Sequence, residues 1–375
     1  MKLLDCVERG SMKIVFLAPA NSSHTIKWCK WFSGHGHQVT VISLTAPDEE
    51  IAAKVHYLNS GIGSQAHDWQ KLGYLTQCRK VRNLVDELQP DIINVHYATS
   101  YGTLAALAGL KHYILSVWGS DVYDFPRKSW LHKKMLQFSL KRAGLLFSTS
   151  QAMAEEAAKY TAKPFDITPF GVDMDLFHPR RRNRQDRDFV IGTVKTLSPK
   201  YGIATLLKAA AKVRQKFPDI PLKIRIAGRG AHEAEYHVLA TKLGLNDCLT
   251  WLGFISQEEA ANEWANFDCA IIPSESESFG VSAVEAQSCG CPVIISDIPG
   301  LMEATNPGET SMVIPRGDVD ALAEAIVKLY QKPELRKKMG EAGRAYVREN
   351  YELNDCFAKV EKLFYSWIKK IRRCG

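Results

Sequence analysis

The chain has 375 residues, of which 46% are hydrophobic and 24% are charged, and its formal net charge is +7 at pH 7. This length suffices for two domains with separate cores, and the composition excludes a disordered or fibrous protein. The nine cysteines follow neither zinc-ligand nor disulfide spacing, which indicates a reduced, cytoplasmic protein.

An apolar run near the start, MKIVFLAPA (12–20), has some features of a signal peptide. The run is short, and the acidic residues Asp5 and Glu8 precede it, so we interpret it as a buried first strand. No segment approaches the roughly 18 apolar residues that a membrane-spanning helix needs.

In the first part of the chain, short apolar runs alternate with amphipathic segments of helical length. Continuous apolar runs are typical of parallel strands that are buried on both faces of a sheet. The alternation predicts a doubly wound α/β domain over 12–176. Its expected strands are 13–19, 38–44, 91–97, 113–119 and 145–150, and its expected helices include 24–35 and 70–89.

The polar, charged segment 177–188 interrupts this pattern and predicts a linker. The alternation then restarts and predicts a second doubly wound domain over 189–350, with a final helix at 351–375 that packs on the first domain. Ligands of such sheets bind outside the carboxyl ends of the strands, so we expect a site in a cleft between two facing domains. The expected strands are 189–195, 222–228, 249–254, 269–273, 292–296 and 311–315, and the expected helices include 202–216, 231–243, 257–266 and 319–331.

Two segments, 126–144 and 359–373, concentrate the positive charge. In the first, basic residues alternate with apolar ones such as Trp130 and Leu131 at helical spacing, and no acid is present. Two interpretations stay open: a solvated basic face over a core, or peripheral docking of 126–144 on anionic lipid at the inner face of the membrane. Because no nucleic-acid-binding module accompanies the charge, we expect no nucleic-acid partner.

The stretch PSESESFGVSAVEAQSCGCPV (273–293) places Glu277 and Glu285 on either side of a predicted helix start near Phe279 and Gly280. Eight helical residues would separate the two carboxylates by ~12 Å, more than the roughly 5–9.5 Å of a glycosidase pair. The spacing fits better with two contacts to one long ligand whose centre rests on the helix N-terminus, where free N–H groups suit phosphate. A phosphate-centred ligand with hydroxyl groups at each end is a nucleotide-sugar. The alternative is that Glu277 and Glu285 are ordinary surface acids.

The same stretch closely resembles the E-x7-E signature of the retaining glycosyltransferases of family 4, which have the GT-B fold of two Rossmann-like domains. Further segments match the family in the same order, and the resemblance extends from Met12 over nearly the whole chain. It is more specific in the second half. The matching segments include GHGHQVTVIS (34–43), WGSDVY (118–123), TPFGVDMDLFHP (168–179) and IAGRGAHEAEYHVLATKLGLNDCLTWLGFIS (226–256).

The resemblance implies a donor site built mainly by the second half of the chain. Glu277 would contact the hydroxyls of the donor sugar, and Glu285 would bind the ribose. Lys195 and Lys200 stand where the family has an Arg and a Lys that bind the diphosphate, although Lys195 lacks the guanidinium fork. The remaining donor-binding candidates are Ser278, Phe279, Gly280, Val281 and Ser282 around the helix start, Gly253, Phe254 and Ile255 by the base, and Asn21 and Ser22 near the phosphates.

The implied reaction transfers a sugar, with retention, from a UDP- or GDP-linked donor to a saccharide or lipid-linked acceptor in cell-surface polysaccharide synthesis. Glu277, Lys195 and Lys200 are the catalytic candidates on the donor side, because two lysines and a helix N-terminus can stabilise the leaving diphosphate without a metal or other cofactor. The alternatives are a nucleotide-sugar epimerase and a non-catalytic protein that binds sugar nucleotides.

The chain departs from the family on the acceptor side. Trp118 stands where relatives often have a histidine near the transferred sugar. Asp121 and His96 are the candidate substitutes, and a satisfied core histidine is the alternative for His96. The VDMD sequence (172–175) looks like a metal-binding DxD motif, but Asp173 and Asp175 are better interpreted as turn and capping residues.

Overall fold

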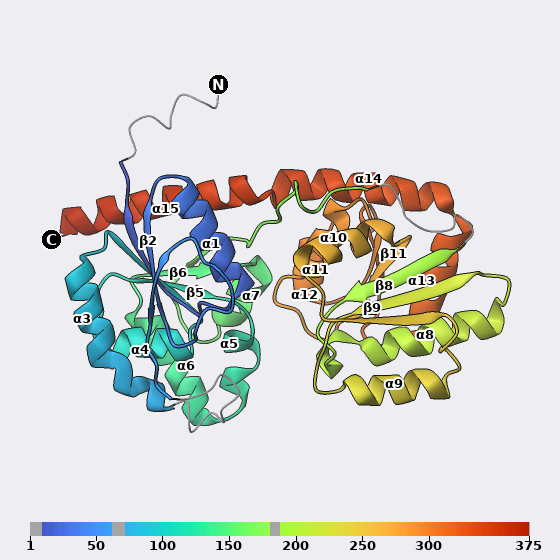
Figure 1. The fold of residues 1–375 in the computed structure, drawn as a ribbon, viewed down its shortest axis with the longest axis horizontal. Coiled ribbons are helices and arrows are strands. Elements are labelled where there is room, and N and C mark those ends of the chain that lie inside the picture. Colours follow the sequence, from blue (N-terminus) through green and yellow to red (C-terminus); the bar gives the residue numbers. More distant parts are fainter. Residues whose placement is uncertain (1–9, 62–71, 181–187, 375) are drawn as a thin grey trace. The chain divides into compact units, whose positions relative to one another are not determined.

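The computed structural model describes residues 10–61, 72–180 and 188–374. The chain divides into two compact units, one made of residues up to Pro169 together with those from Phe357 onward, the other of Phe170–Cys356. Each unit holds one parallel β-sheet with helices packed on it (Figure 1). The expected linker at 177–188 lies partly outside the described residues, since 181–187 are not among them.

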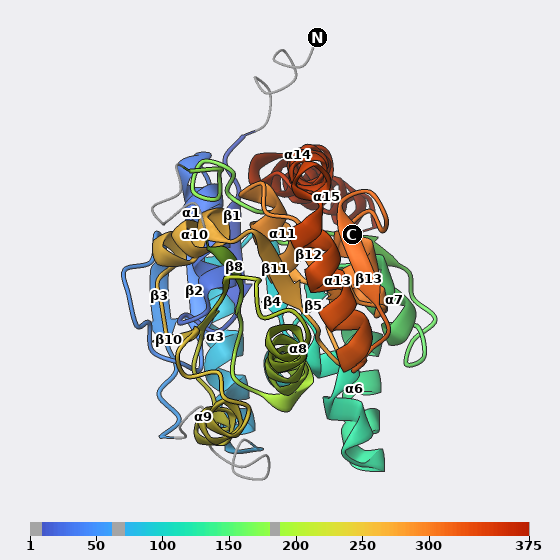
Figure 2. The ribbon, with the colours of Figure 1, turned by 90° about the vertical axis from the view of Figure 1, so that its right-hand side faces the viewer.

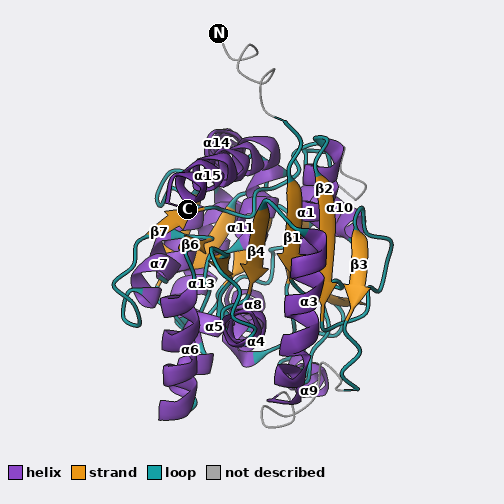
Figure 3. Cartoon of the chain, turned by 90° about the vertical axis from the view of Figure 1, so that its left-hand side faces the viewer, coloured by secondary structure: helices purple, strands orange, loops and turns teal. Residues whose placement is uncertain are grey.

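The first unit contains a seven-stranded sheet with the order β3-β2-β1-β4-β5-β6-β7 among its described residues (Figure 3). All described pairs are parallel; Ile14 of β1, for example, lies between Val39 of β2 and Ile92 of β4. The central strands are almost fully buried because helices cover both faces, as their continuous apolar sequences predict. The strands are β1 (Lys13–Leu17), β2 (Gln38–Ser43), β3 (Lys54–Tyr57), β4 (Ile92–His96), β5 (Ile114–Val117), β6 (Leu145–Ser148) and β7 (Phe165–Ile167).

Helices connect these strands. The expected helix at 24–35 is α1, and the expected helix at 70–89 is a 3-10 turn, η1, followed by α3, with residues 70 and 71 outside the described part. The described helical elements are α1 (Ser23–Gly34), η1 (Leu72–Gln77), α3 (Cys78–Leu88), α4 (Ser100–Leu107), α5 (Ser120–Tyr123), η2 (Phe125–Arg127), α6 (Trp130–Arg142) and α7 (Gln151–Ala157).

The last part of α15 (Leu353–Cys374) packs in the first unit. Its Phe364 stacks on Phe32 of α1 with a centroid distance of 5.4 Å, and Trp367 Nε1 donates a hydrogen bond to the His112 carbonyl at 2.8 Å. Phe364 is fully buried, and burial of one such side chain contributes about 1.5–3 kcal/mol. The apolar face of the basic tail segment therefore belongs to the core of this unit.

The basic segment 126–144 forms η2 and α6. Leu136, Ser139 and Leu140 are its buried face, whereas Trp130 and Leu131 are 72% and 56% exposed. Nowhere in the described ranges does a helix have both the length and the apolar character that a bilayer crossing requires.

The second unit contains a six-stranded sheet with the order β10-β9-β8-β11-β12-β13 among its described residues (Figure 2). Every described pair is again parallel, so the structure confirms two doubly wound parallel sheets. The strands are β8 (Phe189–Val194), β9 (Leu222–Ala227), β10 (Leu249–Gly253), β11 (Cys269–Ile272), β12 (Val293–Ser296) and β13 (Ser311–Ile314).

Helices flank this sheet too. Residues of α8, α9 and α13 share one hydrophobic core with the strands, whereas α10 supplies the fully buried Trp264. The described helical elements are η3 (Pro199–Tyr201), α8 (Ile203–Lys216), α9 (Glu233–Lys242), α10 (Gln257–Asn266), α11 (Val281–Ser288), α12 (Pro299–Ala304), α13 (Val319–Gln331) and α14 (Pro333–Asn350).

Candidate functional site

The second sheet has its topological switch point between β8 and β11. The chain proceeds from β8 outward through β9 to β10, and then resumes on the other side of β8 with β11. The loops that leave the carboxyl ends of β8 and β11 therefore diverge, and doubly wound sheets bind their ligands at such a crevice. The loop after β8 begins with Lys195, and the loop after β11 carries Glu277.

Lys195 and Glu277 meet at this switch point. Lys195 Nζ forms an ion pair with Glu277 Oε1, and each side chain is only 10% exposed. Ser274 Oγ lies 3.5 Å from the same carboxylate oxygen, and the ring centroid of Tyr201 lies 4.8 Å from the ammonium group. The structure thus joins a candidate phosphate ligand and a candidate sugar ligand in one partly buried charge pair.

The helix that follows, α11, starts with an uncapped N-terminus. Its N-cap is Gly280, whose φ of 97° is a left-handed conformation that favours glycine, and no side chain caps this end of the helix in the described structure. Ser282 Oγ instead donates to the Val194 carbonyl at 3.1 Å, which ties the first turn to the end of β8. The N–H groups of this first turn therefore suit an anion.

The helix begins at Val281, directly after the start expected near Phe279 and Gly280. Phe279 is not part of it: the Phe279 ring is 2% exposed and packs edge-on against Tyr351 with a centroid distance of 5.1 Å. The side chain of Phe279 thus anchors the loop. Ser278 precedes it and is half-buried.

Glu285 lies one turn into α11 and is half-buried. Its Oε2 accepts a hydrogen bond of 3.4 Å from Nε1 of Trp264, which is buried in α10. The indole therefore helps to orient this carboxylate. Sequence reasoning missed this partner, because contacts between α10 and α11 are set by packing and not by spacing.

Close backbone contacts fix the three loops around Lys195. Gly228, after β9, has φ 134°, and a Cβ there would lie 1.9 Å from the Lys195 carbonyl oxygen. Gly202, at the start of α8, has φ 69°, and a Cβ there would lie 1.9 Å from the Pro273 carbonyl oxygen. Only glycine fits these two positions, so the loops after β8, β9 and β11 lie directly against one another.

Lys200 and Lys195 both approach the ring of Tyr201. Lys200 Nζ is 5.4 Å from the Tyr201 ring centroid, and the Lys200 carbonyl accepts the Glu275 N–H at 2.8 Å. Tyr201 was not among the expected site residues; an aromatic residue directly after a candidate phosphate-binding lysine is the signal that could have indicated it.

The candidate base-binding residues lie at the end of the outer strand β10. Gly253 has φ 67°, Phe254 is 78% exposed, and Ile255 is half-buried. They share the carboxyl edge with Lys195 and Glu277, and β9 lies between β10 and β8. The structure therefore brings Lys195 and Glu277 into contact and places Lys200 by the same tyrosine as Lys195. Gly253, Phe254 and Ile255 lie farther along the same edge, after the outer strand β10.

The first sheet has its switch point between β1 and β4, and His96 is the last residue of β4. The His96 side chain is fully buried against the rings of Phe16, Trp28 and Trp118, which fits the alternative of a core histidine, and its role near an acceptor stays a prediction. Its Nε2 lies 2.8 Å from Asn94 Oδ1. Burial, with a smaller effect of nearby His24, lowers the pKa of His96 from 6.5 to about 3.

Asp121 is also fully buried, and its role near an acceptor stays a prediction. Its carboxylate accepts backbone N–H bonds from Ala98 and Gly119, both at 2.8 Å, and from Trp118 at 3.2 Å. Burial raises the pKa of Asp121, and these bonds oppose the shift. Asp121 thus fixes the loops after β4 and β5.

The loop after β1 carries Asn21 and Ser22. Asn21 is exposed, and its Oδ1 accepts a bond of 3.0 Å from Thr45 Oγ1. Ser22 is the N-cap of α1 without a side-chain cap bond, and the His24 ring lies 5.6 Å from that of Trp118. These residues lie at the carboxyl edge of the first sheet, as expected for a ligand-facing loop.

The VDMD segment forms a turn. Asp173 Oδ1 accepts the N–H groups of Asp175 at 3.0 Å and of Leu176 at 3.1 Å, which confirms the turn interpretation for Asp173. Across the described ranges, no three His, Cys, Asp or Glu side chains are grouped so that they could hold a metal ion.

Comparison with known proteins agrees with this architecture. The family model for glycosyl transferases group 1 matches residues 176–346, and that for glycosyl transferase 4-like proteins matches residues 13–150. D-inositol 3-phosphate glycosyltransferase of Pseudarthrobacter chlorophenolicus is 34% identical over 214 residues, 53% of this chain and 50% of that protein. The protein EpsD of Bacillus subtilis, named as a glycosyltransferase, is 27% identical over 88% of this chain and 91% of its own length. The chain thus matches about half the length of the first relative and most of the second.

Solved structures share the fold. Sucrose-phosphate synthase from Thermosynechococcus elongatus superposes with a TM-score of 0.82 at 19% identity, over 96% of this chain and all of that chain. Anabaena HepE, in a complex with UDP and glucose, superposes with a TM-score of 0.79 at 20% identity, over 95% of this chain and all of that chain. The two family models and the shared fold show that the chain belongs to the GT-B glycosyltransferases of the family 4 type.

Proposed function

We propose that this protein transfers a sugar, with retention of configuration, from a nucleotide-sugar to a saccharide or lipid-linked acceptor in cell-surface polysaccharide synthesis. The observation that carries the proposal is the Lys195–Glu277 ion pair at the switch point of the second sheet, beside the uncapped N-terminus of α11. This arrangement offers a cation and backbone N–H groups to a diphosphate, and a carboxylate to sugar hydroxyls.

The reaction needs stabilisation of the negative charge that develops on the leaving nucleoside diphosphate. Lys195, Lys200 and the first-turn N–H groups of α11 would supply it as the glycosidic bond breaks. Glu277 would accept hydrogen bonds from sugar hydroxyls once a phosphate replaces it at Lys195. In the same proposal, Glu285, oriented by Trp264, binds the ribose diol, and the leaving phosphate accepts the proton of the acceptor.

The relatives support this choice of substrate class. Anabaena HepE is described in complexes with UDP, with UDP and glucose, and with UDP-glucose. Two relatives are named as a D-inositol 3-phosphate glycosyltransferase and an alpha-(1->4)-mannosyltransferase. We therefore propose a UDP- or GDP-linked donor for this chain. The charge groups already named can stabilise the leaving group without a metal.

Incubation of the protein with UDP-, GDP- and ADP-sugars, with and without candidate acceptors, tests the proposal. We expect transfer to require an acceptor and to persist in EDTA, and we expect NMR of the product to show the anomeric configuration of the donor sugar. An epimerase would convert the sugar without an acceptor, and a non-catalytic binder would leave every donor intact; either result contradicts the proposal.

A lipid-linked acceptor would place the enzyme at a membrane surface, and α6 has the chemistry for peripheral contact with anionic lipid. Exposed Trp130 and Leu131 begin the helix, and exposed Lys133 and Lys134 follow them. We expect co-sedimentation with phosphatidylglycerol vesicles that is lost in a Trp130→Ser, Leu131→Ser double variant. Equal co-sedimentation of the variant and the natural chain would contradict this contact.

A further inference from the structure

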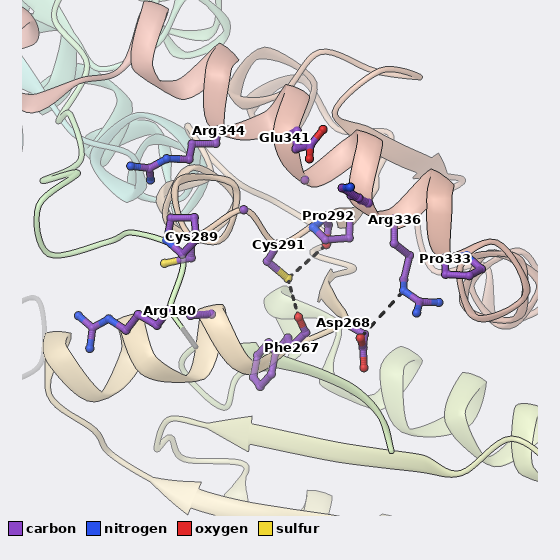
Figure 4. A pocket seen from close by; sticks show the side chains of 15 residues that line it. Arg180, Phe267, Asp268, Cys289, Cys291, Pro292, Pro333, Arg336, Glu341 and Arg344 are labelled. Carbon is purple, nitrogen blue, oxygen red and sulfur yellow. Dashed lines mark hydrogen bonds and ion pairs between the residues drawn. The ribbon is translucent and has the colours of Figure 1, made fainter. Parts of the chain in front are cut away.

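A groove of about 500 Å³ lies at the amino-terminal edge of the second sheet (Figure 4). One wall is a face of α14, and the other consists of residues that directly precede β11 and β12, together with Pro179 and Arg180. Glu277 follows β11 at its opposite end, and four strand residues span roughly 13 Å. The groove is therefore separate from the candidate donor site.

The lining of the groove is predominantly basic. Four cationic side chains face two acidic ones: Arg180, Arg336, Lys337 and Arg344 against Asp268 and Glu341. One carboxylate, Asp268, and one cation, Arg336, have structural roles. Asp268 Oδ2 accepts the Val190 N–H at 2.9 Å and Oδ1 lies 4.0 Å from Arg336 Nε, while Arg336 Nη1 donates to the Tyr330 carbonyl at 3.0 Å near the end of α13.

The other cations have no carboxylate partner within the described ranges. Arg180 Nη2 donates to the Leu176 carbonyl at 2.9 Å, and its Nε is buried without a hydrogen-bond acceptor among the described residues. Arg344 Nη1 donates to the carbonyls of Phe177 and Ser288. Backbone carbonyls hold both guanidinium groups in place, and Arg180 Nη1 also donates to Asn262 Oδ1. All these acceptors are neutral, so no described carboxylate compensates the two positive charges.

Figure 4 shows Arg180 and Arg344 extending in the same direction on either side of Cys289, from opposite walls of the groove. Burial, and to a smaller extent the nearby charge of Arg348, lowers the pKa of Arg344. Partly buried cations without a counter-charge cost free energy, which a bound anion would offset.

We propose that this groove is a second ligand site, which binds a phosphate group through Arg180, Lys337 and Arg344. A guanidinium offers two parallel N–H donors that match phosphate oxygens, and the exposed ammonium of Lys337 adds a third cation. The volume is that of a typical small-molecule site, so the phosphate can belong to a larger soluble molecule or to a lipid headgroup.

Titration of the full chain with inorganic phosphate, at constant ionic strength set with sodium chloride, tests the soluble source. The informative variant is Lys337→Glu, because this side chain is exposed and makes no described hydrogen bond or ion pair. We expect its phosphate affinity to be about tenfold lower, since the charge of the groove changes by two units. The matched control is Lys338→Glu, an exposed neighbour on α14 that does not line the groove, and it should bind like the natural chain.

Co-sedimentation with phosphatidic acid vesicles, against neutral phosphatidylcholine vesicles, tests the lipid source. The proposal is supported if Lys337→Glu loses phosphate binding or vesicle binding and Lys338→Glu does not. The assay in which binding is lost shows whether the phosphate belongs to a soluble molecule or to a lipid headgroup. Arg344→Gln should show the same loss if the variant folds. Equal behaviour of Lys337→Glu and Lys338→Glu in both assays, or no phosphate binding at all, would overturn the proposal.

Discussion

Lys195 and Glu277 lie 82 residues apart in the sequence and form an ion pair at the switch point of the second sheet. The lysine directly follows β8 and the glutamate follows β11, so the topology of the sheet, and not local sequence, brings them together. If a nucleotide-sugar binds here, its phosphate must take the place of Glu277 at the ammonium group, which frees the carboxylate for the sugar.

Glu277→Gln should impair donor use severely. The variant loses the charged acceptor of the sugar hydroxyls and leaves Lys195 partly buried without its partner, so we expect kcat/KM to fall roughly 100-fold. Steady-state kinetics with the preferred donor measure this effect. Glu275→Gln is the control, because Glu275 lies in the same loop but its side chain is 43% exposed. The ion pair that Glu275 forms, at 3.6 Å, is with the exposed Arg316 and not with Lys195. Similar kinetics of the two variants would contradict the role of Glu277.

Glu285→Gln should weaken nucleotide binding more than it slows the chemical step. The carboxylate, oriented by Trp264 Nε1, is the proposed acceptor for two ribose hydroxyls, and the amide can accept with only one of its two polar atoms. We expect a dissociation constant for the nucleoside diphosphate about tenfold higher by calorimetry. An unchanged dissociation constant would contradict the role of Glu285 in nucleotide binding.

Gly228→Ala should disturb the position of Lys195. The added Cβ would lie 1.9 Å from the Lys195 carbonyl oxygen, a backbone atom that cannot move without displacing the loop after β8. Gly244→Ala is the matched control, because Gly244 also has a positive φ, 69°, but nothing lies within 4 Å of the added Cβ. We expect Gly244→Ala to lose about 1 kcal/mol of stability with activity retained. Gly228→Ala should lose activity as well, and full activity in a folded Gly228→Ala protein would contradict the close packing of these loops.

The pH dependence of stability should reveal the burial of His96. Its pKa is about 3 in the folded chain and near 6.5 when unfolded, so the unfolded state binds a proton first as the pH falls. The stabilising contribution is complete above pH 6.5 and is lost progressively between pH 6.5 and about 3. Denaturant unfolding at a series of pH values should therefore show a shallower acid loss for His96→Gln than for the natural chain. Parallel curves would indicate that His96 is accessible to solvent.

The sequence predicted the two doubly wound sheets well, because buried parallel strands such as FVIGTV of β8 are continuous apolar runs. It did not predict β3 or β7, whose residues are half-buried or exposed at the sheet edges and lack that pattern. Edge strands are defined by their neighbours, and no local signal in KVHY or FDI indicates them.

The sequence likewise predicted the local features of the candidate site but not its contacts between distant residues. The Gly280 turn and the α11 helix follow from local sequence, whereas the Lys195–Glu277 pair and the Trp264–Glu285 bond depend on which strands become neighbours. His96 and Asp121 were candidates near the acceptor because they could substitute for the histidine that relatives often have where Trp118 stands. Their complete burial reflects the aromatic side chains of α1 and the backbone N–H groups around Asp121, which spacing does not report.

A crystal structure of the protein with the nucleoside diphosphate that raises its melting temperature most would test the central claim directly. We predict that the diphosphate lies against the first-turn N–H groups of α11 and that Lys195 Nζ contacts a phosphate oxygen in place of Glu277. A nucleotide bound elsewhere, with the charge pair intact and that helix end unoccupied, would contradict it.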